Sequence, residues 1–220
     1  MTERAPTADG GAVAVTTSGR TGPTDPEVVV RLAQPKDYPA IARLTVAAYR
    51  ADGQLVGEAG RRYTKVLADV PARANAGDLL VAVGRSDRWA TPDAAVDRAG
   101  PPSGADGEKV LGSVLFVLPN TPYAELSRPG EAEFRMLAVD PAAQGRGVGR
   151  ALVRACLDRA RQRGARSVII CTRSFSRPAQ RLYAKLGFVR EPERDWSPAP
   201  GVELLALRRD LTDWEFGSVA

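Results

Sequence analysis

The sequence predicts one α/β (α+β) domain, with a mixed central sheet of about seven strands flanked by helices. Three observations support this prediction. Residues 134–163 read as an apolar strand, a glycine-rich turn and an amphipathic helix. The apolar runs 79–83 and 110–118 have no helical pattern between them, which favours antiparallel pairing. A chain of 220 residues buries one sizeable core, and a second domain would be small.

The first elements of the chain are defined by apolar runs and capping residues. Residues 1–26 are rich in Thr, Gly, Ala and Pro without apolar periodicity, so we expect a disordered tail there. Val28–Leu32 is the first expected strand. Asp37 is placed to cap a helix that has Pro39 in its first turn and continues to about Arg50.

The next region combines helical and strand patterns. We expect residues 53–77 to be helical, with a break at Pro71, because proline interrupts the helical hydrogen bonds. The strands expected at 79–83 and 110–118 enclose the polar segment 85–108, which is rich in proline and glycine. This segment is predicted to be a flexible insertion in a hairpin.

The second half of the chain is predicted to contain a long loop, the central strand and further helices and strands. The loop 119–130 contains three prolines and is long for a simple connection, and such loops are often functional. The central strand runs from residue 131 to 139, and the helix at 151–163 stops at Gly164. The other expected elements are a strand at 167–172, a helix at 178–186 capped by Ser174 or Ser176, and strands at 188–190 and 202–207. Residues 212–220 are expected to form a C-terminal tail, so the domain is predicted to extend over 27–211.

The glycine-rich turn at 144–149 is the strongest chemical signal. A helix that begins on small residues presents unpaired backbone N–H groups and the positive end of its dipole, and phosphate is the usual ligand of such a site. A dinucleotide fingerprint does not fit, because counting from Gly145 puts Arg150 at its last glycine position. Counting from Gly147 puts Leu152 there. No Gly-Lys pair occurs, so a Walker A loop is also excluded.

The turn instead matches Q/R-x-x-G-x-G/A and resembles the pyrophosphate-binding motif of the GCN5-related N-acetyltransferase (GNAT) superfamily. Glu133–Pro141 resembles the central strand of that family, and Pro178–Phe188 resembles its second conserved segment. The resemblance extends over 28–211. It implies an acetyl-CoA-dependent N-acetyltransferase that acts on a primary amine by direct attack within a ternary complex. A different acyl-CoA or acceptor, and a non-catalytic acyl-CoA-binding regulatory module, stay open as alternatives.

The same resemblance implies how the donor binds. The main chain of the central strand would hold the pantetheine arm, between strands that splay apart, and the backbone N–H groups of the turn would take the pyrophosphate. Gln144 would anchor the turn, while Arg146 and Arg150 would add positive charge. The expected cofactor-binding residues are Leu137, Ala138, Val139, Gln144, Gly145, Arg146, Gly147, Val148, Gly149 and Arg150.

The catalytic groups must come from a chain without histidine. Ser-His-Asp, Cys-His and histidine-metal mechanisms are therefore excluded, and any base is a carboxylate, tyrosine, cysteine, lysine or relayed water. By resemblance, Glu133 is the carboxylate that deprotonates the amine through a water; the alternative is an ion pair with Arg135 on the same strand face. Tyr183 matches the family tyrosine that protonates the leaving thiolate; the alternative is a core tyrosine.

A second family carboxylate, on the strand after the central one, is missing here. Its place falls at Cys171 or Thr172, so that route is absent, and a cysteine in this apolar run is typical of an inert core residue. The other cysteine, Cys156, forms no C-x-x-C pair with it, so we expect neither a disulfide scaffold nor a metal site.

Composition limits the partners. The net charge is +5, but the arginines are scattered over predicted helices and the 6% of aromatic residues do not interleave with them, so no nucleic acid is expected. No apolar run approaches membrane-spanning length and the N-terminus lacks a signal-peptide pattern, which favours a cytoplasmic location. The acceptor is expected to be a small-molecule or peptide amine. Tyr123, Trp196 and Trp214 are candidates for lining its pocket, and a homodimer stays open.

Overall fold

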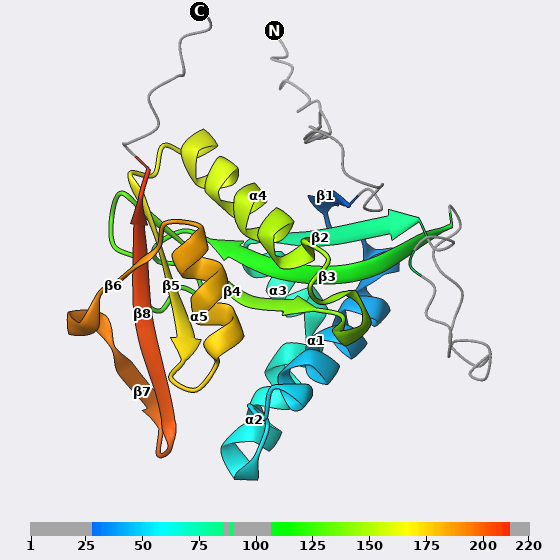
Figure 1. The fold of residues 1–220 in the computed structure, drawn as a ribbon, viewed down its shortest axis with the longest axis horizontal. Helices are drawn as coiled ribbons and strands as arrows, with labels where there is room; N and C mark the ends of the chain where they lie inside the picture. The colour runs from blue at the N-terminus through cyan, green and yellow to red at the C-terminus, as the bar shows by residue number, and fades with distance from the viewer. Residues whose placement is uncertain (1–27, 86–88, 90–106, 212–220) are drawn as a thin grey trace, which may run out of the picture.

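The computed structural model describes residues 28–85, 89 and 107–211. The predicted tails at 1–26 and 212–220, most of the insertion at 85–108 and Trp214 lie outside the described residues. The described part forms a single sheet with helices on both faces (Figure 1). None of its helices is both long enough and apolar enough to cross a bilayer.

The described residues form eight strands and five α-helices. The strands are β1 Val29–Leu32, β2 Asp78–Arg85, β3 Glu108–Val117, β4 Glu131–Val139, β5 Ser167–Arg173, β6 Val189–Arg190, β7 Trp196–Ala199 and β8 Val202–Asp210. The helices are α1 Tyr38–Ala51, α2 Gly57–Ala68, α3 Val70–Ala76, α4 Val148–Gln162 and α5 Arg177–Lys185, with short 3-10 turns at Pro35–Asp37, Pro141–Ala143 and Pro192–Arg194.

The sheet is mixed, as predicted. Its order is β1-β2-β3-β4-β5-β8-β6, with β7 paired to β8. All neighbours are antiparallel except β4 and β5, which are parallel. This parallel pairing covers only Glu131–Glu133 against Ser167–Ile169. Beyond it the two strands diverge, so the second half of β4 has one edge that β5 does not use (Figure 1).

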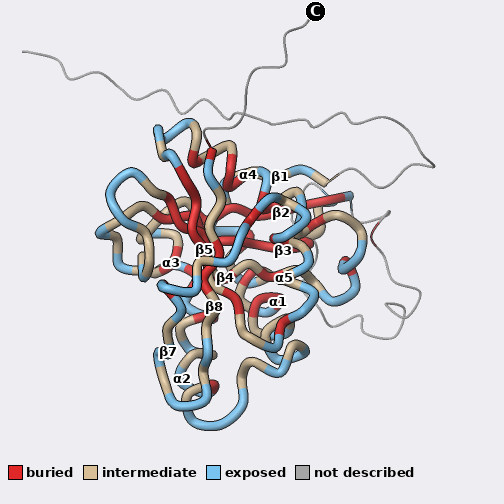
Figure 2. The backbone as a smooth tube through the Cα atoms, turned by 60° about the vertical axis from the view of Figure 1, so that its left-hand side comes forward, coloured by how far each residue is buried: buried red, intermediate tan, exposed pale blue. Residues whose placement is uncertain are grey.

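The core lies on both faces of the sheet, because helices cover both. Alternate residues of β2 point to opposite faces: Leu80 and Ala82 pack with α4, whereas Leu79 and Val81 pack with α1 and α3. A strand covered on both sides reads as a continuous apolar run rather than an alternating one. Figure 2 shows the consequence, with buried residues concentrated in the strands at the centre.

Asp37 and Ser176 are the N-cap residues of α1 and α5, as predicted, but neither side chain hydrogen-bonds to the start of its helix. Asp37 precedes α1, but its carboxylate pairs with the guanidinium of Arg31 at 2.7 Å and accepts from the backbone N–H of Gln34 at 2.8 Å. Ser176 precedes α5, but its hydroxyl donates to the Asp52 carboxylate at 3.0 Å. In each case a charged partner from elsewhere in the fold replaces the local helical N–H, since charge-assisted hydrogen bonds are the stronger ones.

A helix start, the position of a helix break and one additional strand also differ from the prediction. Helix α4 begins at Val148 rather than at residue 151, because a left-handed glycine precedes it. Pro71 lies in the first turn of α3, where its missing N–H costs nothing, and Asp69 caps that helix by accepting from the backbone N–H of Ala72. The strand β7 was not predicted; it contains Pro198 and pairs only with β8, an edge position where proline is tolerated.

Candidate active site

The central strand β4 contains a bulge directly before its predicted cofactor-binding segment. Against β3, the register shifts by one residue between Ser113 and Leu115, and Met136 has a φ of 53°. A bulge adds one unpaired residue and bends the strand, and such features are over-represented next to active sites. The bend therefore accompanies the separation of β4 from β5 and leaves the backbone of 136–139 beside open space.

The glycine turn connects this strand to α4. Gly145 and Gly147 have φ values of 76° and 83°, which favour glycine because a Cβ is strained there. Gly147 is the residue that precedes the helix, and its carbonyl accepts the first helical hydrogen bond from Ala151. The N–H groups of the first helical turn accordingly have no helical partner, and Val148, Gly149 and Arg150 of that turn line a pocket.

The arginine within the turn is held by the insertion. The guanidinium carbon of Arg146 lies 3.6 Å from the centroid of the Trp89 ring, a cation–π contact. Trp89 is 1% exposed and packs so closely on Gly84 that a Cβ at that glycine would lie 2.3 Å from the indole nitrogen. The insertion thus contributes one buried side chain beside the turn.

One large pocket brings the predicted residues together. Its volume is about 1130 Å³, and it runs from the glycine turn along β4, then between α1–α2 and the β7–β8 hairpin. All the predicted cofactor-binding residues except Arg146 line it: Leu137, Ala138, Val139, Gln144, Gly145, Gly147, Val148, Gly149 and Arg150. The pocket therefore connects the glycine turn at one end with a second compartment at the other.

Tyr183 of α5 lies between the core and the pocket. Its ring is 6.0 Å from that of Phe134 and 5.7 Å from that of Phe188, and the residue is 5% exposed. It also lines the pocket beside the diverging strands. Burial raises the pKa of its phenol well above the usual range, so the hydroxyl keeps its proton at neutral pH. Tyr183 can therefore be packed in the core, which was the alternative considered from the sequence, and still donate its hydroxyl proton.

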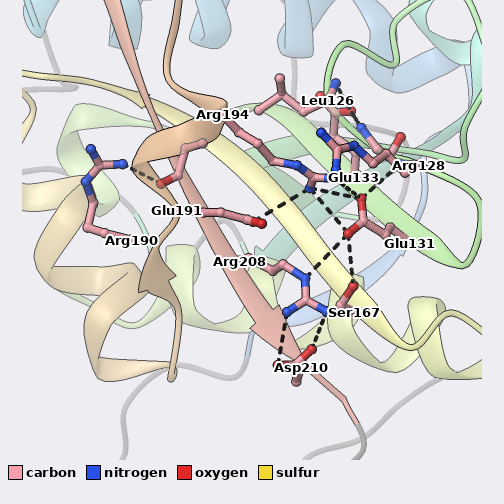
Figure 3. A network of polar contacts seen from close by, with 12 residues as sticks. Leu126, Arg128, Glu131, Glu133, Ser167, Arg190, Glu191, Arg194, Arg208 and Asp210 are labelled. Carbon is pink, nitrogen blue, oxygen red and sulfur yellow. Dashed lines mark hydrogen bonds and ion pairs between the residues drawn. The ribbon is translucent and has the colours of Figure 1, made fainter.

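Glu133 is 1% exposed and faces the loop 118–130 rather than the pocket (Figure 3). Its Oε2 accepts hydrogen bonds from three consecutive backbone N–H groups, those of Glu125, Leu126 and Ser127, at 3.0, 2.9 and 3.0 Å. Its Oε1 lies 3.8 Å from Nε of Arg135, the partner named as the alternative from the sequence. Among the described residues, Glu133 is not part of the pocket lining.

Among the described residues, two carboxylates do line the pocket, those of Asp52 and Glu125, and Glu125 belongs to the same loop. Arg135 pairs with it through a 2.7 Å contact and also donates to the backbone carbonyl of Tyr123 at 2.8 Å. Burial raises the pKa of Glu125, while the neighbouring Arg135 opposes that rise. Sequence reasoning marked the loop as unusual but passed over Glu125, because no local pattern distinguishes it from a surface glutamate.

Two tyrosines form the wall of the second compartment. Tyr49 of α1 and Tyr63 of α2 have ring centroids 6.0 Å apart, and both line the pocket. The aromatic residues suggested from the sequence do not take this place: among the described residues, neither Tyr123 nor Trp196 belongs to the lining. Helical periodicity placed the two tyrosines on helices, but only their packing shows that they meet.

Cys171 of β5 lines the same compartment. Burial raises the pKa of its thiol to about 11, so it is a neutral thiol at physiological pH and a weak nucleophile. The described residues contain no group of three or more Cys, Asp or Glu side chains that could hold a metal ion. Besides Cys171, the titratable side chains that line the pocket are carboxylates, tyrosines, arginines and Lys185.

An open strand edge that ends at a glycine-rich helix start defines an α/β site for a phosphate-bearing cofactor. Residues 78–188, which are 111 of the 220 residues, match the family model described as the acetyltransferase (GNAT) family. The chain belongs to that family, as its motifs predicted.

Individual relatives agree with this assignment. The chain is 32% identical to a mycothiol acetyltransferase of Nocardioides sp. over 66% of its own length and 50% of the relative. It is 38% identical to the N-alpha-acetyltransferase RimI of Mycobacterium tuberculosis over 41% of its length and 60% of that protein. Among solved structures it resembles a GCN5-related N-acetyltransferase from Kribbella flavida, with 27% identity, a TM-score of 0.52 and coverage of 84% and 98%. The chain spans about half the length, or less, of the mycothiol acetyltransferases that it matches.

Proposed function

We propose that the protein is an acetyl-CoA-dependent N-acetyltransferase that acts on a primary amine by direct attack within a ternary complex. The observation that carries this proposal is a single pocket that contains both the unused edge of β4 with its glycine turn and a separate compartment lined by tyrosines and a carboxylate. Donor and acceptor can then be bound together, so that no covalent enzyme intermediate is needed.

The donor would be held mainly by backbone groups. The amides of the pantetheine arm pair with the main chain of Leu137 and Val139, which extends the sheet where β5 has left it. The pyrophosphate binds the N–H groups at the start of α4, and Arg150, which lines the pocket, adds positive charge.

In the reaction, the amine nitrogen attacks the thioester carbonyl, a C–N bond forms and the C–S bond breaks. The leaving thiolate takes the proton of the Tyr183 hydroxyl, which burial keeps neutral until that step. The amine must also lose protons, and Glu133 was predicted from the sequence to accept one. Since three loop amides occupy one of its oxygens and it lies outside the described lining, we propose that Glu133 instead holds the loop.

The acceptor is a primary amine on a small molecule or a peptide. The names of the relatives support both kinds, since one is named for mycothiol and the other for an α-amino group. The compartment between α2 and the β7–β8 hairpin is lined by residues from both walls, including Val56, Tyr63 and Pro200.

The donor half of the proposal is tested by acetyl-CoA-dependent thermal stabilisation, which follows mass action on the native state. Gly147→Val should abolish the stabilisation, because a β-branched residue at a φ of 83° distorts the turn. Gly164→Val is the matched control: that glycine has a φ of 71°, and a Cβ there meets no atom within 4 Å. It should lower stability to a similar extent but keep the acetyl-CoA effect, whereas an unchanged shift in Gly147→Val would refute the donor site.

The acceptor half is tested by release of free CoA with a panel of alkylamines, polyamines, amino acids and peptides with different N-termini. Amine-dependent release, with acetylated product seen by mass spectrometry, is the expected result. Binding of acetyl-CoA without release for any amine would favour the non-catalytic acyl-CoA-binding module instead.

A further inference from the structure

The loop 118–130 is held in its second half by two carboxylates, although it contains three prolines and neither helix nor strand. One carboxylate oxygen of Glu133 accepts hydrogen bonds from three consecutive backbone N–H groups of the loop. Further along, Glu131 accepts from the backbone N–H of Arg128 at 2.9 Å and is itself held by Arg194 at 2.9 Å (Figure 3). Two buried or half-buried carboxylates of β4 therefore determine where the loop residues lie, including Glu125.

The side chain of Glu125 is held in turn by Arg135. The guanidinium contacts Oε1 at 2.7 Å, and it is itself fastened by the Tyr123 carbonyl and by the neighbouring carboxylate of Glu133. Arg135 is 14% exposed and Glu125 is 28% exposed, so the pair lies at the pocket wall with the glutamate on the open side. Among the described residues, no other hydrogen-bond donor contacts the Glu125 carboxylate.

Glu125 interacts electrostatically with Arg135 and Glu133 of β4, which are charged, and with the neutral Tyr63 of α2 and Cys171 of β5. Tyr49 of α1 and Arg73 of α3 interact in turn with Tyr63. Burial raises the pKa of Glu125 most, the charge of Glu133 raises it further, and Arg135 opposes both. A carboxylate tuned in this direction has a higher proton affinity than a surface glutamate, as a general base requires.

We propose that Glu125 binds the ammonium group of the acceptor and takes its proton, while Arg135 and Glu133 position it. This deepens the proposed N-acetyl transfer and rests on it. Glu125 lines the same pocket as Tyr183 and the segment 136–139, so an amine bound there shares the cavity with the thioester.

The proton balance assigns each group one task. The acceptor arrives as an ammonium ion and loses one proton to Glu125, which passes it to solvent through the pocket mouth. The neutral amine then forms the C–N bond with the thioester carbon as the C–S bond breaks, and Tyr183 protonates the thiolate. The second proton leaves the nitrogen after the attack and restores the Tyr183 phenol, so that one proton is released overall.

Glu125→Gln tests the proposal, with Glu58→Gln as a matched control on the exposed face of α2. Glu125→Gln should keep the melting temperature and the acetyl-CoA stabilisation, because Glu133 still holds the loop. Its kcat/KM for the amine should fall by roughly 10²-fold or more, the scale of general-base catalysis, and should recover towards high pH, where more amine is already neutral. Glu58→Gln should match the wild-type protein in all three measurements.

Arg135→Gln is a second test variant. Its readout is the pH–rate profile, which a purely structural role of Arg135 would leave unchanged. Removal of the group that opposes the rise in the pKa of Glu125 should shift the acidic limb of the pH–rate profile to higher pH. A wild-type rate and pH profile in Glu125→Gln would overturn the proposal, even if the wild-type enzyme acetylates amines.

If the wild-type protein released no CoA with any amine, the proposed function would fail. A carbon-13 NMR titration of the glutamate carboxyl groups would then test separately whether Glu125 binds the amine and takes its proton. We expect a signal, missing in Glu125→Gln, that titrates above the ordinary glutamate range and shifts when n-propylamine is added to the CoA-bound protein. A Glu125 signal that titrates in the ordinary glutamate range and does not shift when the amine is added would overturn the inference by itself.

Discussion

Replacing Glu133 with glutamine keeps the size of the side chain but removes the charge that three loop amides share. In the native protein all three N–H groups point at one carboxylate oxygen, at 2.9 to 3.0 Å, in a site that is 1% exposed. The amide of glutamine has one acceptor oxygen, and its NH₂ group must then face either the loop amides or Arg135, which are all donors.

The expected loss follows from the number of these bonds. A hydrogen bond to a charged group contributes about 1.5–3 kcal/mol and a neutral one about 0.5–1.5 kcal/mol, so each bond weakens by about 1 kcal/mol. Three bonds give a decrease of about 3 kcal/mol in the free energy of unfolding. For a domain of this size, 1 kcal/mol corresponds to about 2–4 °C, so the melting temperature should fall by about 6–12 °C.

Thermal and urea denaturation of the purified variant measure this change, with Glu58→Gln, whose side chain is 70% exposed, expected within about 0.5 kcal/mol of the wild-type protein. Activity should also decline, because the loop that carries Glu125 loosens. A wild-type melting temperature combined with a lower turnover that recovers at high pH would refute this reasoning. That result would establish Glu133 as the base predicted from the sequence.

Two further predictions address the acid and a structural ion pair. Tyr183→Phe should keep the acetyl-CoA thermal shift but lower kcat by roughly 10²–10⁴-fold where protonation of the thiolate limits the rate; an unchanged kcat would reduce Tyr183 to a packing role. Asp37 is buried, and although burial alone would raise its pKa, the hydrogen bonds from Arg31 and Gln34 lower it. Its folded pKa therefore lies below the unfolded value, so it stabilises the protein above pH ~4 and this contribution is lost as the pH falls through the folded pKa. Asp37→Asn should accordingly destabilise the protein at pH 7 and progressively less in acid, and a pH-independent difference in urea unfolding would contradict this.

The parts of the protein that could be predicted from the sequence are those whose cause is local. The glycine turn and the start of α4 depend on residues that tolerate positive φ, and Gly147 adopts 83°. The strands β2 and β3 are visible as apolar runs because both faces of the sheet are covered. Tyr183 was identified because its motif lies in one continuous segment. The mixed sheet and the family followed from such segments, whereas the order of the strands in the sheet did not.

What only the tertiary structure decided depends on groups far apart in the chain or in irregular backbone. The side-chain hydroxyl of Ser176 donates to Asp52 across 124 residues, and no local pattern encodes that choice over a helix cap. Glu133 accepts hydrogen bonds from three amides of the loop, so its sequence position predicted a base, whereas these contacts support the proposal that it anchors the loop. Glu125 looks like any surface glutamate until the folded loop brings it to the pocket wall beside Arg135. Charge, burial and hydrogen bonding act over distance in space, and the proton affinity of a carboxylate is therefore a property of the folded chain.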